Sequence, residues 1–83
     1  MKILPLSARL VKYLTKRRLT NKYKKQAALL SQNFRHPGLH VERLEPKNLG
    51  FYSFRIDQQF RAIFFYIPEK NAIKVIDIND HYR

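Results

Sequence analysis

The spacing of apolar residues changes once along this chain, and that change constrains the fold more than any other feature. Up to Phe34 the apolar residues recur every three or four positions, as on one side of an α-helix. From Leu39 onward they begin to alternate, as on one side of a β-strand. Pro37 and Gly38 stand between the two parts, and both residues interrupt helices. The pattern therefore predicts helices first and a sheet second.

Two helices are expected in the first part. Leu6, Leu10 and Leu14 follow helical spacing, and Ser7 is a candidate N-cap for them. A second helix is expected to start after Thr20, another good cap residue. Its apolar side would consist of Tyr23, Ala27, Leu30 and Phe34.

Three or four strands are expected around and after the helices. Residues 51–57 alternate, with Tyr52, Phe54 and Ile56 on one side. The other expected elements are a short strand at residues 1–4, a hairpin tip at 57–59, a buried strand at 60–67, a turn at 68–71 and a last strand at 72–78. The prediction is an α+β fold, with two antiparallel helices packed on one face of a three- to four-stranded, mainly antiparallel sheet.

The chain of 83 residues is short enough for one domain, expected over residues 1–83, with one modest core. It has no cysteine, which excludes disulfides and thiolate metal sites. No apolar run approaches the roughly 20 residues of a membrane span, and no signal-peptide core is present. A cytoplasmic location is the default expectation.

Positive charge is concentrated in the first half. The chain has 17 Lys plus Arg against 6 Asp plus Glu, and residues 1–41 hold ten of the basic residues and none of the acidic ones. Such a surface attracts polyanions, so nucleic acid is the first candidate partner and an acidic protein the second. A membrane surface is less favoured, because its binding also requires a large apolar face. The RNA-binding candidates on the helices are Lys16, Arg17, Arg18, Lys22 and Lys25.

Arg55 and Arg61 are unusual because they stand inside predicted strands. A three-residue hairpin loop would place both on one face of the sheet, whereas a two-residue loop would separate them. Paired guanidinium groups on an open face suit a phosphate. The alternative is a structural ion pair between Arg55 and Asp57, Asp77 or Asp80.

Glu42 and His81 suggest a second kind of chemistry, although residues of these types also occur on inert surfaces. A carboxylate, an imidazole and an arginine together suit RNA cleavage, in which a base takes the 2′-hydroxyl proton and an acid protonates the leaving oxygen. His36 and His40 are four positions apart, but Pro37 and Gly38 lie between them. A metal site there is therefore less favoured than an ordinary loop.

The second part of the chain resembles a known toxin family. Its features are Gly50-Phe51-Tyr52-Ser53 leading into Arg55, then Phe60-Arg61, a hydrophobic strand and a terminal His81-Tyr82. These features resemble the RelE/ParE superfamily of bacterial toxins and are most similar to the YoeB-like ribosome-dependent mRNA endonucleases. The resemblance extends from His36 to the end, and the first 35 residues share only the two basic helices.

The resemblance implies a RelE-like domain and a role for each matching residue. Glu42 is the candidate general base, His81 the candidate general acid, and Arg61 the residue that stabilises charge on the scissile phosphate. Tyr82 would orient or stack on a base, Arg55 would assist Arg61, and Lys47 is the nearest counterpart of the catalytic lysines of RelE. No metal or other cofactor is implied.

The same resemblance implies partners and leaves alternatives. It predicts the toxin of a type II toxin–antitoxin system that cleaves mRNA in the ribosomal A site, contacts ribosomal RNA and is held inactive by an acidic antitoxin. One alternative is a ParE-like toxin directed at DNA gyrase, against which Glu42 and His81 argue. Another is a basic RNA-binding protein without catalytic activity.

Overall fold

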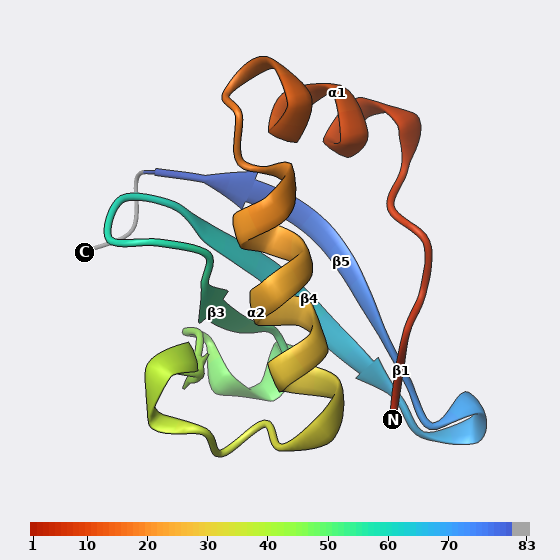
Figure 1. The fold of residues 1–83 in the computed structure, drawn as a ribbon. Coiled ribbons are helices and arrows are strands. Elements are labelled where there is room, and N and C mark those ends of the chain that lie inside the picture. Colours follow the sequence, from red (N-terminus) through yellow and green to blue (C-terminus); the bar gives the residue numbers. More distant parts are fainter. Residues whose placement is uncertain (81–83) are drawn as a thin grey trace.

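The structure is a computed structural model that describes residues 1–80. The expectations for His81 and Tyr82 concern residues outside that range. Two helices pack on one face of a single sheet, as Figure 1 shows, and this arrangement confirms the predicted α+β fold. The sheet has five strands rather than three or four. The additional strand is β2 (Glu42–Arg43), only two residues long at one edge. The short strand expected at residues 1–4 forms the other edge as β1 (Lys2–Ile3).

The strands follow the order β1-β5-β4-β3-β2. The three central strands are β3 (Tyr52–Arg55), β4 (Arg61–Ile67) and β5 (Ala72–Asn79). They pair antiparallel, and β1 pairs parallel with β5. Short turns connect the central strands. Strand β1 precedes both helices in the chain and lies at the edge of the sheet beside the last strand, β5.

The first helix, α1 (Ala8–Lys16), begins as the sequence indicates. The Ser7 hydroxyl accepts a hydrogen bond from the backbone N–H of Leu10 at 3.3 Å, which confirms Ser7 as the N-cap. Leu10 and Leu14 are buried, but Val11 points away from the core and is 48% exposed. Of these three apolar residues of α1, only the two leucines therefore contribute to the core.

The second helix, α2 (Thr20–Gln32), differs from the prediction at both ends. Leu19, not Thr20, is its N-cap, because Leu19 is drawn into the core and the chain is already helical at Thr20. At the other end Asn33 is extended, and its side chain accepts a hydrogen bond from the Arg35 N–H at 3.1 Å. This local bond competes with further helix. Phe34 therefore lies beyond α2 and is 44% exposed. Its predicted place on the apolar side of the second helix was wrong.

The core lies between the helices and one face of the sheet. Figure 1 shows α1 lying across the N-terminal end of α2, so the two helices cross instead of running antiparallel side by side. Phe54 is fully buried under α2, and Ile56 and Phe64 are buried beside it. Phe54 and Ile56 confirm the predicted alternation of residues 51–57. Each such buried side chain stabilises the fold by roughly 1.5–3 kcal/mol.

Candidate active site

The turn between β3 and β4 decides which side chains share the open face of the sheet. The Ile56 N–H donates to the Phe60 carbonyl at 2.9 Å, which leaves a loop of three residues, Asp57 to Gln59. The Asp57 carboxylate accepts the N–H groups of Gln59 and Phe60, both at 2.8 Å. Arg55 is directly paired with Arg61, and directly paired residues lie on the same face. The three-residue alternative of the sequence analysis is therefore confirmed.

Arg61 is held tightly, although it belongs to the face that the helices leave open. It is 6% exposed. Its Nε donates to the Ser53 hydroxyl at 3.1 Å, and its Nη2 donates to the backbone carbonyl of His40. Burial lowers the pKa of Arg61 and Arg55 lowers it too, whereas the Glu42 carboxylate acts in the opposite direction. The guanidinium is thus a fixed, partly desolvated cation.

Glu42 joins the two arginines on this face. It is paired with Ser53 across β2 and β3, and Ser53 lies on the same side of β3 as Arg55. The Glu42 side chain is exposed, and its charge is close enough to influence the pKa of Arg61. The structure therefore brings Glu42, Arg55 and Arg61 together. His81 and Tyr82, the other two predicted catalytic residues, lie outside the described residues.

Gln26 connects α2 to the strand and the loop that frame this site. Its Nε2 donates to the Arg55 carbonyl at 2.8 Å and to the Gly38 carbonyl at 3.2 Å. One amide thus ties the end of β3 to the loop that continues to the His40 carbonyl. Sequence reasoning missed this contact, because a glutamine among lysines on a helix gives no signal. It also missed the role of Ser53, whose signal was a polar residue within an aromatic strand.

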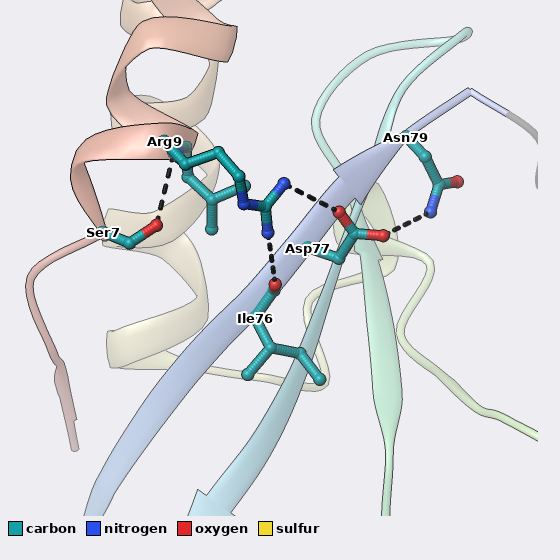
Figure 2. Close-up of polar contacts among 6 residues, drawn as sticks. Ser7, Arg9, Ile76, Asp77 and Asn79 are labelled. Carbon is teal, nitrogen blue, oxygen red and sulfur yellow. Dashed lines mark hydrogen bonds and ion pairs between the residues drawn. The ribbon is translucent and has the colours of Figure 1, made fainter.

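Asp77, which could have neutralised Arg55, is engaged elsewhere. Figure 2 shows Arg9 of α1 reaching β5, where its guanidinium lies 3.7 Å from the Asp77 carboxylate and donates to the Ile76 carbonyl at 3.2 Å. The Asn79 amide donates to the other oxygen of Asp77 at 3.3 Å. Asp57, a second predicted alternative partner of Arg55, pairs instead with Lys22 at 3.3 Å. Asp77 therefore connects α1 to the sheet.

The basic residues of the helices are not part of this site. The helices cover the face of the sheet opposite Arg55 and Arg61. The exposed basic residues on α1, α2 and the turn between them are Lys16, Arg17, Arg18, Lys22 and Lys25. Lys22 contacts the hairpin tip through Asp57, and the Arg17 guanidinium lies 3.6 Å from the centre of the Tyr13 ring. Lys47 is exposed in a short 3₁₀ helix, Lys47–Leu49. A nucleic acid that contacted both the basic residues of the helices and the two arginines of the candidate site would have to pass around an edge of the sheet.

Residues 1–80 contain no group of three or more His, Cys, Asp and Glu side chains placed to hold a metal ion. His36 has a local role instead, since its Nδ1 accepts the Gly38 N–H at 3.0 Å. No helix in this part of the chain is both long and apolar enough to cross a membrane. The chemistry that the described site offers is that of two guanidinium groups and one carboxylate, which suits binding of a phosphate and removal of a nearby proton.

Several solved structures of bacterial toxins share this fold. A YoeB/ParE toxin from Agrobacterium tumefaciens superposes with a TM-score of 0.75 and 19% identity, over 99% of this chain and 100% of that chain. The YoeB dimer from Staphylococcus aureus gives a TM-score of 0.71 and 21% identity, over 98% and 94% of the two chains. The heterotetrameric YoeB–YefM toxin–antitoxin complex of the same organism gives 0.69 and 22%, with the same coverage. A search of the curated proteins finds no match.

The sequence itself matches a family model over nearly its whole length. The model describes the RelE-like toxin of the type II toxin–antitoxin system HigB, and it matches residues 8–82. This match includes the two helices, which the sequence resemblance left out, and every residue of the site described above. The expected membership of the RelE/ParE superfamily is confirmed by this match, and the expected likeness to the YoeB toxins is confirmed for the fold. The chain therefore belongs to the HigB-like family of RelE-like toxins of type II toxin–antitoxin systems.

Proposed function

We propose that this toxin is an endoribonuclease that cleaves mRNA on the ribosome and so inhibits translation. The observation that carries the proposal is the direct pairing of Arg55 with Arg61 on the open sheet face, with Glu42 on the same face. Two guanidinium groups beside one carboxylate match the needs of a phosphodiester whose neighbouring 2′-hydroxyl must lose a proton.

The proposed reaction needs one base, one acid and stabilisation of charge on phosphorus. Glu42 takes the proton of the 2′-hydroxyl, whose oxygen attacks the adjacent phosphorus. The bond to the 5′ oxygen breaks, and an acid returns a proton to that oxygen. The products are a 2′,3′-cyclic phosphate, which can open to a 3′ phosphate, and a 5′-hydroxyl. Sequence analysis assigns the acid to His81 and base orientation to Tyr82.

The two arginines have different tasks in this proposal. Arg55 is half-buried and makes the first contact with the phosphate. Arg61 lies deeper and is oriented by Ser53 and by the His40 carbonyl, so it meets the charge that develops in the transition state without reorganising. A guanidinium keeps its proton at any working pH, and no metal ion is required for this step.

The proposed partners follow from the charge distribution and from the relatives. The exposed basic residues of α1 and α2 would contact ribosomal RNA on the face away from Arg55. The YoeB–YefM complex of Staphylococcus aureus supports an antitoxin as the second partner. An acidic antitoxin is the kind that suits a chain of net charge +11.

The test is cleavage of a defined mRNA on purified ribosomes by the wild type and by matched variants. Glu42→Gln removes the proposed base, and Glu69→Gln changes a carboxylate that is also exposed but lies in the turn between β4 and β5. We expect cuts at A-site codons with 5′-hydroxyl ends, abolished by Glu42→Gln and by His81→Gln, and unchanged by Glu69→Gln. Co-sedimentation with ribosomes should be the same for all four proteins.

Other outcomes would assign the chain to one of the alternatives. Wild-type protein that binds ribosomes without cutting, and loses binding when helix lysines are removed, would be an RNA-binding module. Inhibition of DNA gyrase without RNA cleavage would indicate ParE-like activity. Cleavage that survives Glu42→Gln would leave the nuclease assignment in place and remove Glu42 from the mechanism.

A further inference from the structure

Two adjoining hollows lie on the helix side of the sheet, beyond the C-terminal end of α2. We call them together the α2-end groove. The first has a volume of about 290 Å³ and the second about 470 Å³. Both are lined by Phe34, Val41 and Tyr52, so they form one continuous surface. Glu42, Arg55 and Arg61 line neither hollow, because they project from the opposite face of the sheet. The two places adjoin at His40, which lines the second hollow and whose carbonyl accepts the hydrogen bond from Arg61.

The first hollow is apolar and aromatic. Besides the three shared residues it is lined by Met1, Phe64, Tyr66 and Ile73. Phe34 and Tyr66 are 44% and 43% exposed, which is costly for aromatic side chains in water. The Tyr66 hydroxyl donates to the Asn71 side chain at 2.9 Å, so the ring is held in place. A preformed aromatic hollow of this kind fits apolar side chains of a partner.

The second hollow is basic. Its further lining residues are Arg35, His36, Pro37, His40 and Arg43. The Arg43 guanidinium donates to the Lys47 carbonyl at 2.8 and 3.1 Å and lies 5.8 Å from the centre of the Tyr52 ring. Arg35 lies 5.6 Å from the centre of the Phe34 ring. None of the described residues that line either hollow is acidic, so the groove presents positive charge next to apolar surface.

We propose that the α2-end groove binds an acidic amphipathic segment of the antitoxin, with its apolar side chains in the first hollow and its carboxylates against Arg35 and Arg43. The inference rests on the antitoxin partnership of the proposed function. It adds where the partner docks, namely on the helix face, and therefore without covering Glu42 or Arg55. Arginines presented in this way favour carboxylates, with which they form paired hydrogen bonds.

Charge and shape favour this occupant over two others. A second copy of the chain would bring another net charge of +11 toward Arg35 and Arg43, which is repulsive. RNA would suit the basic hollow, but it carries a phosphate on every nucleotide, and the aliphatic walls formed by Val41 and Ile73 offer those phosphates no partner. An acidic segment with apolar residues satisfies both halves at once.

The test uses the small acidic protein that we expect to be encoded beside this toxin, both whole and as overlapping synthetic peptides, with binding measured by fluorescence anisotropy. We expect at least one peptide that is both acidic and apolar to bind. Phe34→Ser and Tyr66→Ser should each weaken its binding about tenfold, because exposed aromatic anchors are typical hot spots. Arg35→Glu should weaken it to a similar extent.

Two control variants carry similar substitutions outside the α2-end groove. Val11→Ser removes an apolar side chain of similar exposure on α1, and Lys24→Glu reverses a charge on the exposed side of α2. Neither residue lines the groove, so neither change should alter peptide binding by more than about twofold. Far-UV circular dichroism and the melting temperature confirm that each variant is folded.

Each alternative result overturns the inference in a recognisable way. If the antitoxin binds tightly but ignores the groove variants, the docking site is wrong and the antitoxin partnership stands. If sedimentation shows a dimer that Phe34→Ser dissociates, the groove is a contact between copies of this chain. If Phe34→Ser weakens ribosome binding instead, the groove belongs to RNA. If no segment of the acidic protein binds while mRNA cleavage is intact, both the partner and the docking site are wrong.

Discussion

The two faces of the β3–β4 hairpin are built from alternate residues of the same strands, yet they are buried for different reasons. On the helix face Phe54, Ala62 and Phe64 are covered by α2 and contact other apolar side chains. On the open face Ser53 and Arg61 are just as inaccessible, but they are hydrogen-bonded to each other. Apolar packing is non-directional, whereas a buried charge is tolerated only with specific partners. Apolar packing on the helix face therefore stabilises the fold, whereas the hydrogen bonds on the open face fix the orientation of the Arg61 side chain.

The largest expected effect comes from breaking the helix face. Phe54 is fully buried against Tyr23 and Phe64, so Phe54→Ala should cost about 3–5 kcal/mol of unfolding free energy. Urea denaturation followed by circular dichroism measures this loss. Phe54→Leu, which leaves a smaller cavity, is the control and should cost clearly less. Equal stability of wild type and Phe54→Ala would show that α2 does not rest on this residue.

Arg61→Lys tests whether geometry governs the open face. Lysine keeps the positive charge but loses the planar fork that donates to both Ser53 and the His40 carbonyl. We expect mRNA cleavage on ribosomes to fall about 10²–10³-fold, as for removal of one preoriented donor. Full activity of Arg61→Lys would mean that only charge matters here.

Ser53→Ala should have an intermediate effect. It leaves the buried Arg61 Nε–H without its hydroxyl acceptor, which should cost about 1–3 kcal/mol of stability. Cleavage should also fall, by less than in Arg61→Lys. Because Ser53 and Arg61 are in contact, the double variant Ser53→Ala/Arg61→Lys should lose less stability than the sum of the losses in the two single variants. Additive losses would show that the serine acts independently of Arg61.

The smallest effect is expected at Tyr23, where the helix face buries one polar atom. The Tyr23 hydroxyl is buried and has no hydrogen-bond partner within residues 1–80, so Tyr23→Phe should stabilise the fold by up to about 1 kcal/mol. The matched control is Tyr13→Phe on α1, at a partly buried ring whose hydroxyl is not in this position. A clear loss of stability in Tyr23→Phe would contradict this reading.

Tyr23 should also make the stability of the fold depend on pH in the alkaline range. Burial raises the pKa of Tyr23 to about 12. In the unfolded chain this tyrosine ionises near pH 10 while in the folded chain it stays neutral, so its ionisation in the unfolded state lowers the stability of the fold as the pH rises from about 10 toward 12. Thermal melts of wild type and Tyr23→Phe between pH 9 and 12, where the wild type should lose more, measure the difference.

Much of the fold followed from local pattern, and the two errors at the ends of α2 share one cause. The cap at Ser7, the alternation around Phe54 and the turn at 68–71 were all confirmed. The errors at Thr20 and Phe34 lie at the ends of α2, where burial of Leu19 and the side chain of Asn33 decide the boundary. Helix ends depend on single contacts, whereas helix interiors depend on a repeated pattern.

The candidate site was predicted as separate residues rather than as an arrangement. Sequence spacing selected Arg55 and Arg61 but left their faces open, because one residue in the loop reverses the outcome. The three-residue turn stabilised by Asp57 settled that question. The basic helix residues, expected to bind ribosomal RNA, belong to the helices, which cover the other face of the sheet.

By itself, the sequence determined the order of helices and strands, the side of residues 51–57 that enters the core, and the excess of positive charge in the first half, because each is a property of neighbouring residues. Only the tertiary structure decided that the Gln26 amide joins β3 to the loop before β2, and that the His40 carbonyl orients Arg61. It also decided that Phe34 and Tyr66 remain exposed at one groove. These contacts join segments far apart in the chain, so no local pattern encodes them.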